Sequence, residues 1–272
     1  MYSKSEHAKH VDDIEHPSVK ECIRFAGLNQ GLEIHHDADL PARSGLGSSS
    51  SFTVGLLHCL GALSDRKYTK MELSSDAIHV EQEMIRENVG SQDQTHAALG
   101  GFNHIEFHRD SSIHASPVSM SSNMRTALND HLLLFFTGLS RFASEIAEEQ
   151  ILNSPAKENE LREMKDMVGE AIKILNNRVE SIGDFGLLLD ESWKLKRSLS
   201  TRITSDEIDA WYKSGLQAGA SGGKLLGAGA GGCMLFFCEP DRQQHVIGAL
   251  SSLLHIPFRF ENEGSQLILN KS

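Results

Sequence analysis

The pattern of apolar and polar positions predicts that the first half of the chain mixes helices with short strands. Apolar residues recur at helical spacing from Val19 to Leu28, just after a proline at position 17, a residue that suits the first turn of a helix. The stretch LEIHHDADLP alternates apolar and polar positions as a strand does. We therefore expect helices over 16–29 and 71–87, a loop with its helix over 45–63, and strands over 32–41, 102–108 and 111–118.

The second half is dominated by helical periodicity between residues 141 and 217. Two almost entirely apolar runs, HLLLFFTG from His131 and CMLFFCE from Cys233, predict buried strands. We expect helix breaks at 154–155, 182–184 and 201–204, a helix near 241–254 and a hairpin within 258–269. This order of elements is typical of an antiparallel sheet backed by helices. The polar segment 119–123 is the best candidate boundary, so the prediction is an α+β chain with two domains, residues 1–120 and 121–272.

The charge of the chain argues against nucleic acid as a partner. Its 26 Lys and Arg residues against 37 Asp and Glu residues give a net charge of −11, and no run of basic residues forms the stripe that nucleic-acid-binding proteins show. No apolar run approaches the ~20 residues that span a bilayer, and the first residues lack the apolar core of a signal peptide. The four cysteines match no zinc-binding spacing and are typical of buried thiols in a reducing compartment. We expect a cytoplasmic protein without nucleic-acid or membrane partners.

The segment PARSGLGSSSS, residues 41–51, has the composition of a phosphate-binding loop that leads into a helix. Gly45 and Gly47 would let the backbone approach an anion closely, and the helix start offers unpaired N–H groups with a partial positive charge. The four serine hydroxyls add donors, and one of them can give an oxygen to Mg²⁺. A simpler interpretation is a flexible turn with an ordinary serine N-cap, because serine caps many helices. The segment by itself leaves both interpretations open.

Two carboxylates, Glu81 and Asp93, are the candidates for acid–base and metal chemistry. Glu81 lies in a predicted helix and Asp93 in the loop GSQDQ, so the two side chains could converge on one site. Phosphoryl transfer needs one group that holds Mg²⁺ and one that orients or deprotonates the attacking hydroxyl. The alternative is a solvated glutamate and an aspartate that stabilises a turn.

Residues 219–237, GASGGKLLGAGAGGCMLFF, contain seven glycines within their first fourteen positions. Such a density implies a close approach of the backbone to a ligand or to another loop. Residues 227–232 satisfy GxGxxG, but a dinucleotide-binding site needs a helix after this motif and an apolar strand-like run follows here. Lys224 is followed by leucine, so the segment is no Walker A loop either.

A third candidate is Arg141, which follows the predicted strand at TGLSR. A guanidinium at the end of a buried strand could clamp a phosphate with two hydrogen bonds. It could equally be a solvated arginine in the first turn of the following helix.

Taken in order, PxxxGLGSSSS, the Glu81 and Asp93 pair and GAGAGG resemble the motifs of the GHMP small-molecule kinases, a family that includes galactokinase, homoserine kinase, mevalonate kinase and phosphomevalonate kinase. The resemblance runs from about residue 16 to the end. Within the family, GSQDQTHAALGGFNHIEF, TGLSRFASEI, ESWKLKRSLS and GASGGKLLGAGAGG look most like the kinases of D-glycero-D-manno-heptose 7-phosphate. The resemblance implies an S5-like α/β nucleotide-binding domain, then a ferredoxin-like α+β domain, with the active site in the cleft between them.

The resemblance also implies roles for individual residues, with ATP and Mg²⁺ as cofactors. Ser49 and Glu81 would hold Mg²⁺, and Asp93 would act on the acceptor hydroxyl as a base or orienting carboxylate. Gly227 to Gly232 would support the phosphate loop and border the sugar pocket. Arg141, Lys224 and Arg43 are candidates for the sugar phosphate by charge and location. The implied nucleotide-binding residues are Gly45, Leu46, Gly47, Ser48, Ser49, Ser50, Gly229 and Gly231.

The implied reaction is ATP-dependent phosphorylation of a sugar phosphate at its anomeric hydroxyl, which gives a 1,7-bisphosphate. The alternatives are a GHMP kinase for another sugar and a truncated nucleotide-binding remnant without activity. Members of the family begin with a strand pair that residues 1–15 do not resemble. We therefore expect an incomplete first domain with an exposed edge or apolar face. The chain should be marginally soluble or self-associating as a homo-oligomer, with weak or no kinase activity alone.

Overall fold

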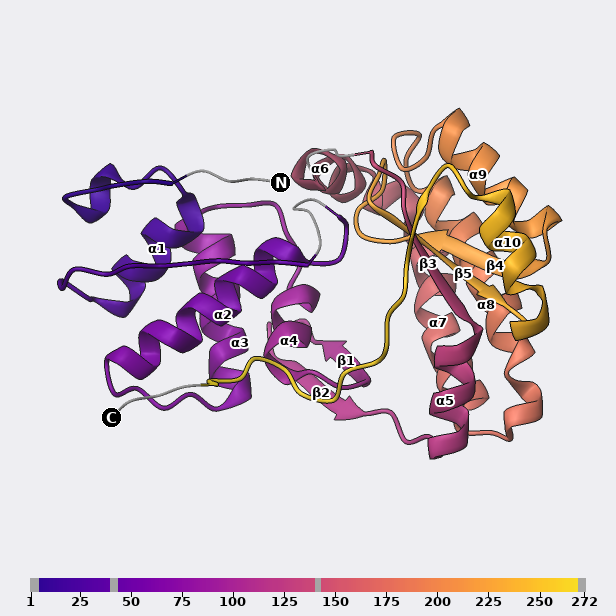
Figure 1. Cartoon of the computed structure of the whole chain (residues 1–272), viewed down its shortest axis with the longest axis horizontal. Coiled ribbons are helices and arrows are strands. Elements are labelled where there is room, and N and C mark those ends of the chain that lie inside the picture. Colours follow the sequence, from indigo (N-terminus) through magenta and orange to yellow (C-terminus); the bar gives the residue numbers. More distant parts are fainter. Residues whose placement is uncertain (1–4, 40–43, 140–142, 269–272) are drawn as a thin grey trace. The chain divides into compact units, whose positions relative to one another are not determined.

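The computed structural model of the chain describes residues 5–39, 44–139 and 143–268. These residues form two compact units, each described separately below (Figure 1). One unit contains residues 5–39, 47–113 and 261–268, and the other contains residues 44–46 and 114–260. The expected boundary at 120/121 would place all later residues in the second domain, whereas residues 261–268 pack with the first unit.

The first unit is built mainly from helices, which are α1 (Pro17–Ala26), α2 (Ser48–Leu63), α3 (Lys70–His79) and α4 (Gln92–Leu99). Local signals fix their ends. His16 caps α1, with Pro17 at its first position, and the Thr69 and Glu72 side chains form a capping box for α3. A π-helical segment, η2 (Val80–Met84), continues α3. The apolar faces of these helices share one core, whose buried members are Cys22, Ile23, Val54, Leu56, Leu57, Leu60, Leu73, Ala77, Val80 and Ala98.

The strand predictions for the first 120 residues have different outcomes. The strands expected at 102–108 and 111–118 are confirmed as β1 (Asn103–Phe107) and β2 (Ile113–Pro117), which pair in a two-stranded sheet. The strand expected at 32–41 is wrong, because the described part, 32–39, is non-helical and unpaired. Leu32 packs against the helical core, whereas residues 33–39 are exposed. The alternating pattern therefore belongs to a surface segment in which only Leu32 packs on the core.

The segment after residue 257 does not form the expected hairpin. The strand β6 (Leu254–Ile256) ends just before this segment, and residues 257–268 contain no strand. Residues 261–268 instead pack on α4 and α2. The Ser265 N–H donates to the Ala97 carbonyl at 2.9 Å, and its hydroxyl lies 2.9 Å from Nδ1 of His58. A Cβ on Gly264 would lie 2.2 Å from the Ala98 carbonyl oxygen, so only glycine permits this approach.

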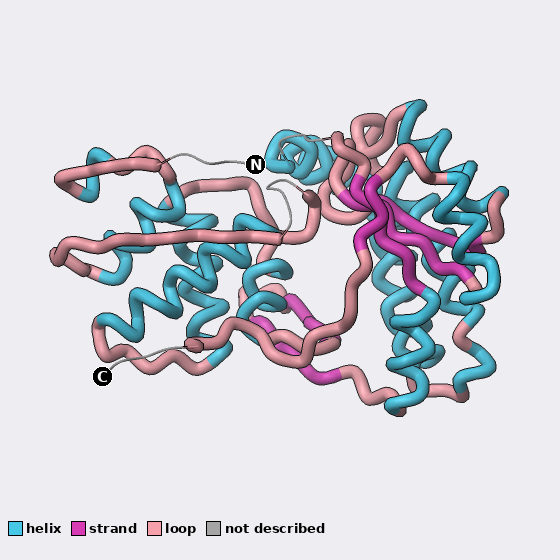
Figure 2. Tube along the Cα trace, in the orientation of Figure 1, coloured by secondary structure: helices cyan, strands magenta, loops and turns pink. Residues whose placement is uncertain are grey.

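The second unit is organised around an antiparallel four-stranded sheet with the order β4–β5–β3–β6 (Figure 2). The two predicted apolar strands are confirmed as β3 (Leu132–Phe136) and β5 (Cys233–Cys238). They pair antiparallel, with Leu134 opposite Leu235. The helices of the unit are α5 (Ser122–His131), α6 (Ala143–Asn153), α7 (Glu158–Leu175), α8 (Gly183–Ser198), α9 (Asp206–Gln217) and α10 (Gln243–Ala249). An antiparallel sheet backed by helices is thus confirmed.

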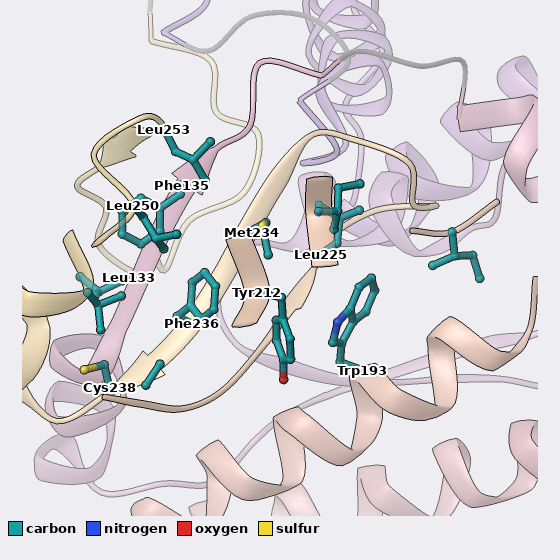
Figure 3. Close-up of a cluster of buried hydrophobic side chains, with 14 of the residues drawn as sticks. Leu133, Phe135, Trp193, Tyr212, Leu225, Met234, Phe236, Cys238, Leu250 and Leu253 are labelled. Atoms are coloured by element: carbon teal, nitrogen blue, oxygen red, sulfur yellow. The ribbon is translucent and has the colours of Figure 1, made fainter. Parts of the chain in front are cut away.

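The core of this unit lies between the sheet and its helices (Figure 3). The ring of Trp193 from α8 lies beside that of Tyr212 from α9, with centroids 6.1 Å apart, and the Tyr212 ring stacks on Phe236 of β5 with centroids 5.9 Å apart. Each of these large rings buries most of its surface, which is the main source of stability in such a core. Among the described residues, no helix is long and apolar enough to cross a bilayer.

Strand β4 (Ala220–Leu225) was not expected, because its sequence ASGGKL is rich in glycine, a residue that weakens strands. The glycines are needed because α8 packs directly on the strand. A Cβ on Gly222 would lie 1.9 Å from the Gly186 carbonyl oxygen, and a Cβ on Gly186 would lie 2.1 Å from Oγ of Ser221. The backbones of helix and strand therefore touch without intervening side chains. A strand does precede GAGAGG, but β5 follows it antiparallel, which still excludes a dinucleotide-binding unit.

Candidate functional site

The site in the first unit begins at the N-terminus of α2. Gly47 is the N-cap residue, with left-handed φ and ψ of 68° and 27°, and no side chain caps the helix. The first backbone hydrogen bond of α2 runs from the Ser51 N–H to the Gly47 carbonyl at 2.9 Å. The N–H groups of Ser48, Ser49 and Ser50 thus lie in the uncapped first turn of a helix, where the partial positive charge favours an anion.

Glu81 lies behind this helix start and is 1% exposed. Its Oε2 accepts a hydrogen bond of 2.8 Å from the Ser50 hydroxyl and another from Nε2 of Gln94. Its Oε1 is buried and has no hydrogen-bond partner among the described residues. Glu81 belongs to the π-helical segment η2, a distortion that is frequent at functional sites. One carboxylate oxygen is therefore held in place, while the other remains available for a ligand.

Asp93, the second residue of α4, lies against the N-cap of α2. A Cβ on Gly47 would come within 3.0 Å of Cγ and 3.1 Å of Oδ2 of Asp93. Partial burial raises the pKa of Asp93 above its usual value, although the nearby His96 opposes this rise. A raised pKa makes a carboxylate a better proton acceptor. The fold therefore brings Glu81 and Asp93 to the same helix start, Glu81 through Ser50 and Asp93 through Gly47.

Sequence reasoning missed two partners in this site. Gln94 is fully buried on α4, and its amide helps to fix the Glu81 carboxylate. The signal was present in GSQDQ, where the glutamine directly follows Asp93. Ser50 was assigned to the phosphate loop, yet its hydroxyl bonds to Glu81, whereas Ser49 is exposed on the first turn. The metal role predicted for Ser49 stays a prediction.

The second unit holds the first half of the loop, Ser44 to Leu46, against the glycine-rich segment between β4 and β5. A Cβ on Gly232 would lie 2.6 Å from the Ser44 carbonyl oxygen, and one on Gly227 would lie 3.0 Å from Cα of Gly45. The glycine-rich segment thus supports the loop by backbone packing.

Gly229 and Gly231 face protein atoms in the same way. Their added Cβ atoms would lie 2.9 Å from Cα of Ile203 and 2.6 Å from the Leu139 carbonyl oxygen. Both glycines are buried. Their assignment to the nucleotide stays a prediction, and these contacts already account for glycine at both positions.

Of the three residues predicted to contact the sugar phosphate, Lys224 lies on β4, whereas Arg43 and Arg141 lie outside the described residues. Lys224 is partly buried, and burial lowers the pKa of its ammonium group. Burial, and to a lesser extent the charge of Lys224, lowers the pKa of a second lysine, Lys196 on α8, to about 7.

The residues around Glu81 fit a magnesium ion that is shared with phosphates. Within the described part of the chain, no three His, Cys, Asp or Glu side chains form a metal-binding group. Mg²⁺ is commonly held by one or two carboxylates together with substrate phosphates and water. The unpartnered, buried Oε1 of Glu81 is one such oxygen, and the hydroxyl of Ser49, an exposed residue in the first turn of α2, would be a second.

The chain matches two family models. Residues 17–101 match the N-terminal domain of GHMP kinases, and residues 170–256 match the GHMP kinase C-terminal domain. The chain belongs to the GHMP kinase family and has its two-domain α+β fold.

The similar proteins include kinases that are named for sugars and for sugar phosphates. The chain is 33% identical over 222 residues to D-glycero-alpha-D-manno-heptose 7-phosphate kinase of Campylobacter jejuni, a match that covers 80% of this chain and 65% of that protein. It is 26% identical to galactokinase of Pyrococcus furiosus, covering 85% and 70% of the two chains. The solved structure of a D-glycero-D-manno-heptose 1-phosphate kinase from Bacteroides thetaiotaomicron superposes with a TM-score of 0.71 at 25% identity, covering 93% and 74%. The chain thus spans about two thirds of the length of its Campylobacter relative.

Proposed function

We propose that the protein transfers the γ-phosphoryl group of ATP to a sugar phosphate, D-glycero-D-manno-heptose 7-phosphate, at its anomeric hydroxyl. The observation that supports this best is the juxtaposition of Glu81, Asp93 and the uncapped start of α2. Such a site offers backbone donors for phosphates, a carboxylate oxygen for a cation and a second carboxylate for a hydroxyl. The similarity to the Campylobacter kinase supports the choice of acceptor.

In this proposal the N–H groups from Gly47 to Ser50 bind the β- and γ-phosphates. Ser49 and Glu81 would hold Mg²⁺, which neutralises phosphate charge when it is bound. Ser50 and Gln94 fix the Glu81 carboxylate, so its second oxygen needs no reorganisation when a ligand binds.

Asp93 takes the proton of the acceptor hydroxyl. The hydroxyl oxygen forms a bond to the γ-phosphorus, and the bond from this phosphorus to the β–γ bridging oxygen breaks, leaving ADP with that electron pair. The proton passes to the Asp93 carboxylate. Because partial burial raises the pKa of Asp93, its basicity is closer to that required at neutral pH.

The test is a coupled ADP-release assay with Mg-ATP and a panel of acceptors: heptose 7-phosphate, the free heptose, galactose, fucose and mevalonate. We expect the highest kcat/KM with heptose 7-phosphate and a product that carries a second phosphate on O1, seen by ³¹P NMR. Equal rates with all sugars would contradict the heptose assignment.

A higher rate with galactose or fucose would favour the second candidate, a kinase for another sugar, which the similarity to galactokinase supports. Calorimetric titration with Mg-ATP separates a kinase from a chain that only binds nucleotide. Nucleotide binding without turnover on any acceptor would contradict the proposed reaction.

A further inference from the structure

The connection between η2 and α4, residues 85–91, joins the two elements that carry Glu81 and Asp93. Its residues are all described and lie outside helices and strands, so no regular ladder of backbone hydrogen bonds fixes it. Arg86 adopts a left-handed φ of 65°, and the Glu87 N–H donates to the Glu81 carbonyl at 3.0 Å. These features hold the first part of the connection against η2.

The side chain of Gln82, in η2, fixes the last part of this connection. Its Nε2 donates to the Val89 carbonyl at 3.0 Å and to the Ser91 hydroxyl at 3.2 Å. A carbonyl oxygen can only accept, so the contact with Val89 requires the amide nitrogen to face it. Both hydrogen bonds are partly buried, where water competes with them less than at the surface. One glutamine therefore bridges η2 to the residue just before α4.

Ser91 is the N-cap residue of α4, and its position sets where that helix begins. Its carbonyl accepts hydrogen bonds from the N–H of Thr95 at 3.4 Å and from Oγ1 of Thr95 at 2.7 Å. The Ser74 hydroxyl of α3 in turn donates to Oγ1 of Thr95 at 3.0 Å. Asp93 is the second residue of α4, so the anchoring of Ser91 fixes the backbone that carries the Asp93 carboxylate.

Gln82 directly follows Glu81 in η2, and the two side chains reach different partners. Glu81 contacts Ser50 of α2 and Gln94 of α4, whereas Gln82 contacts the residues ahead of α4. Neighbouring residues of one helical turn point in different directions, so a single turn can make both sets of contacts. Two side-chain bridges therefore run from η2 to the start of α4, one to Gln94 and one from Gln82.

We propose that Gln82 is a positioning residue for phosphoryl transfer, and that it keeps the Asp93 carboxylate in a fixed place relative to Glu81. The inference rests on the proposed function, in which Asp93 accepts the proton of the hydroxyl and Glu81 holds the cation. A single bridge through Gln94 leaves the start of α4 free to pivot about that contact. The second bridge, at Ser91, opposes the pivoting. Rate depends steeply on position, since a displacement of about 1 Å can cost ~10²-fold.

The experiment replaces Gln82 with methionine, which has a similar length but no N–H donor, in the full chain. Steady-state kinetics use Mg-ATP and heptose 7-phosphate. We expect Gln82→Met to lower kcat by about 10- to 100-fold and to leave the KM for Mg-ATP unchanged, because Glu81 keeps both of its own partners. Gln30→Met makes the same exchange at an exposed glutamine and should match the wild type. A KM for Mg-ATP that rises while kcat stays constant would overturn the inference.

A second variant, Ser91→Ala, removes only the hydroxyl that accepts from Gln82, and it tests the bridge even where Gln82→Met fails to fold. We expect kcat to fall in Ser91→Ala, but by less than in Gln82→Met, because the Val89 carbonyl still accepts from Gln82. Since both changes break one bridge, the double variant should have nearly the kcat of Gln82→Met alone. Two losses that multiply fully would show that Gln82 acts by another route and would overturn the inference.

Hydrogen exchange tests the bridge without any turnover and so separates this inference from the proposed function. The backbone amides of residues 88–95 should exchange faster in Gln82→Met than in the wild type or in Gln30→Met. Faster exchange, together with a wild type that phosphorylates no acceptor, would contradict the proposed reaction and leave the bridge standing. Unchanged exchange and unchanged kcat in Gln82→Met, with an active wild type, would contradict only the role of Gln82.

Discussion

Two glycine-rich segments of this chain, residues 45–47 before α2 and residues 227–232 after β4, have similar compositions but different environments. Gly47 ends its segment at an uncapped helix start, with Asp93 beside it and Glu81 behind it. The later glycines contact protein backbone almost everywhere, including Ile203 and Leu139. Glycine density by itself therefore indicates close backbone approach, and the neighbouring side chains decide whether the approach serves a ligand or the fold.

The largest expected effect is at Asp93, which lies beside Gly47 of the segment that we propose binds phosphate. Asp93→Asn keeps the shape of the side chain but removes its ability to accept a proton. We expect kcat to fall by about 10²- to 10⁴-fold, the usual contribution of a general base, while calorimetry shows little change in the affinity for Mg-ATP. If the affinity for Mg-ATP fell as far as kcat, Asp93 would have a structural role instead.

A larger residue in the glycine-rich segment after β4, residues 227–232, should lower the stability of the fold. Gly232→Ala places a Cβ 2.6 Å from the Ser44 carbonyl oxygen, at a residue with φ of 98°. We expect unfolding to become easier by about 3 kcal/mol, measured by chemical denaturation.

The matched control is Gly169→Ala on α7, where the new Cβ meets no atom within 4 Å. A helical glycine replaced by alanine should stabilise the chain by about 0.5–1 kcal/mol. If Gly232→Ala were as well tolerated as this control, the packing role of the glycine-rich segment would be wrong.

A smaller effect, on KM, is expected at Ser50, which connects the start of α2 to the buried carboxylate of Glu81. Ser50→Ala removes the 2.8 Å hydrogen bond to Oε2 of Glu81 and leaves Gln94 as the remaining side-chain donor. We predict that KM for Mg-ATP rises about 10-fold, because one hydrogen bond to a charged group is lost. Ser51→Ala, at an exposed position in the same turn, should leave this KM unchanged. Equal KM values for both variants would show that Ser50 does not position Glu81.

The smallest expected effect is on the pH dependence of folding stability. The pKa of Asp93 is higher in the folded chain than the ordinary aspartate value of 3.8. The folded state therefore binds the Asp93 proton more tightly than the unfolded state does. The free energy of unfolding consequently falls as the pH rises from the ordinary aspartate value through the higher pKa of the folded state. Asp93→Asn should be slightly more stable than the wild type at pH 7, with the gain disappearing as the pH drops to 3.8 and below. A gain that is independent of pH would refute the link to this carboxylate.

Much of the fold follows from local sequence signals. Helical periodicity and end signals such as His16-Pro17 predicted α1, and the apolar runs predicted β3 and β5. Failures occurred where structure depends on a distant partner. A strand exists only when another strand pairs with it, so 32–39 alternates without pairing, while the glycine-rich β4 pairs with β5.

The candidate site divides in the same way. The motif and its order in the chain pointed to Glu81, Asp93 and the start of α2, because residue types at fixed spacing carry the chemistry. The sequence could not show that Ser50 contacts Glu81, since neighbouring serines differ only in the direction in which the helix turns them.

By itself, the sequence determined the helices, the apolar strands and the family, because periodicity and motifs are properties of short stretches. Only the tertiary structure decided that Gln94 holds Glu81, that residues 261–268 pack with the first unit, and that Lys196 donates to the Gly227 carbonyl. Each of these is a contact between segments far apart in the chain or on different elements. Such contacts depend on how whole helices and strands pack, and no local pattern encodes them.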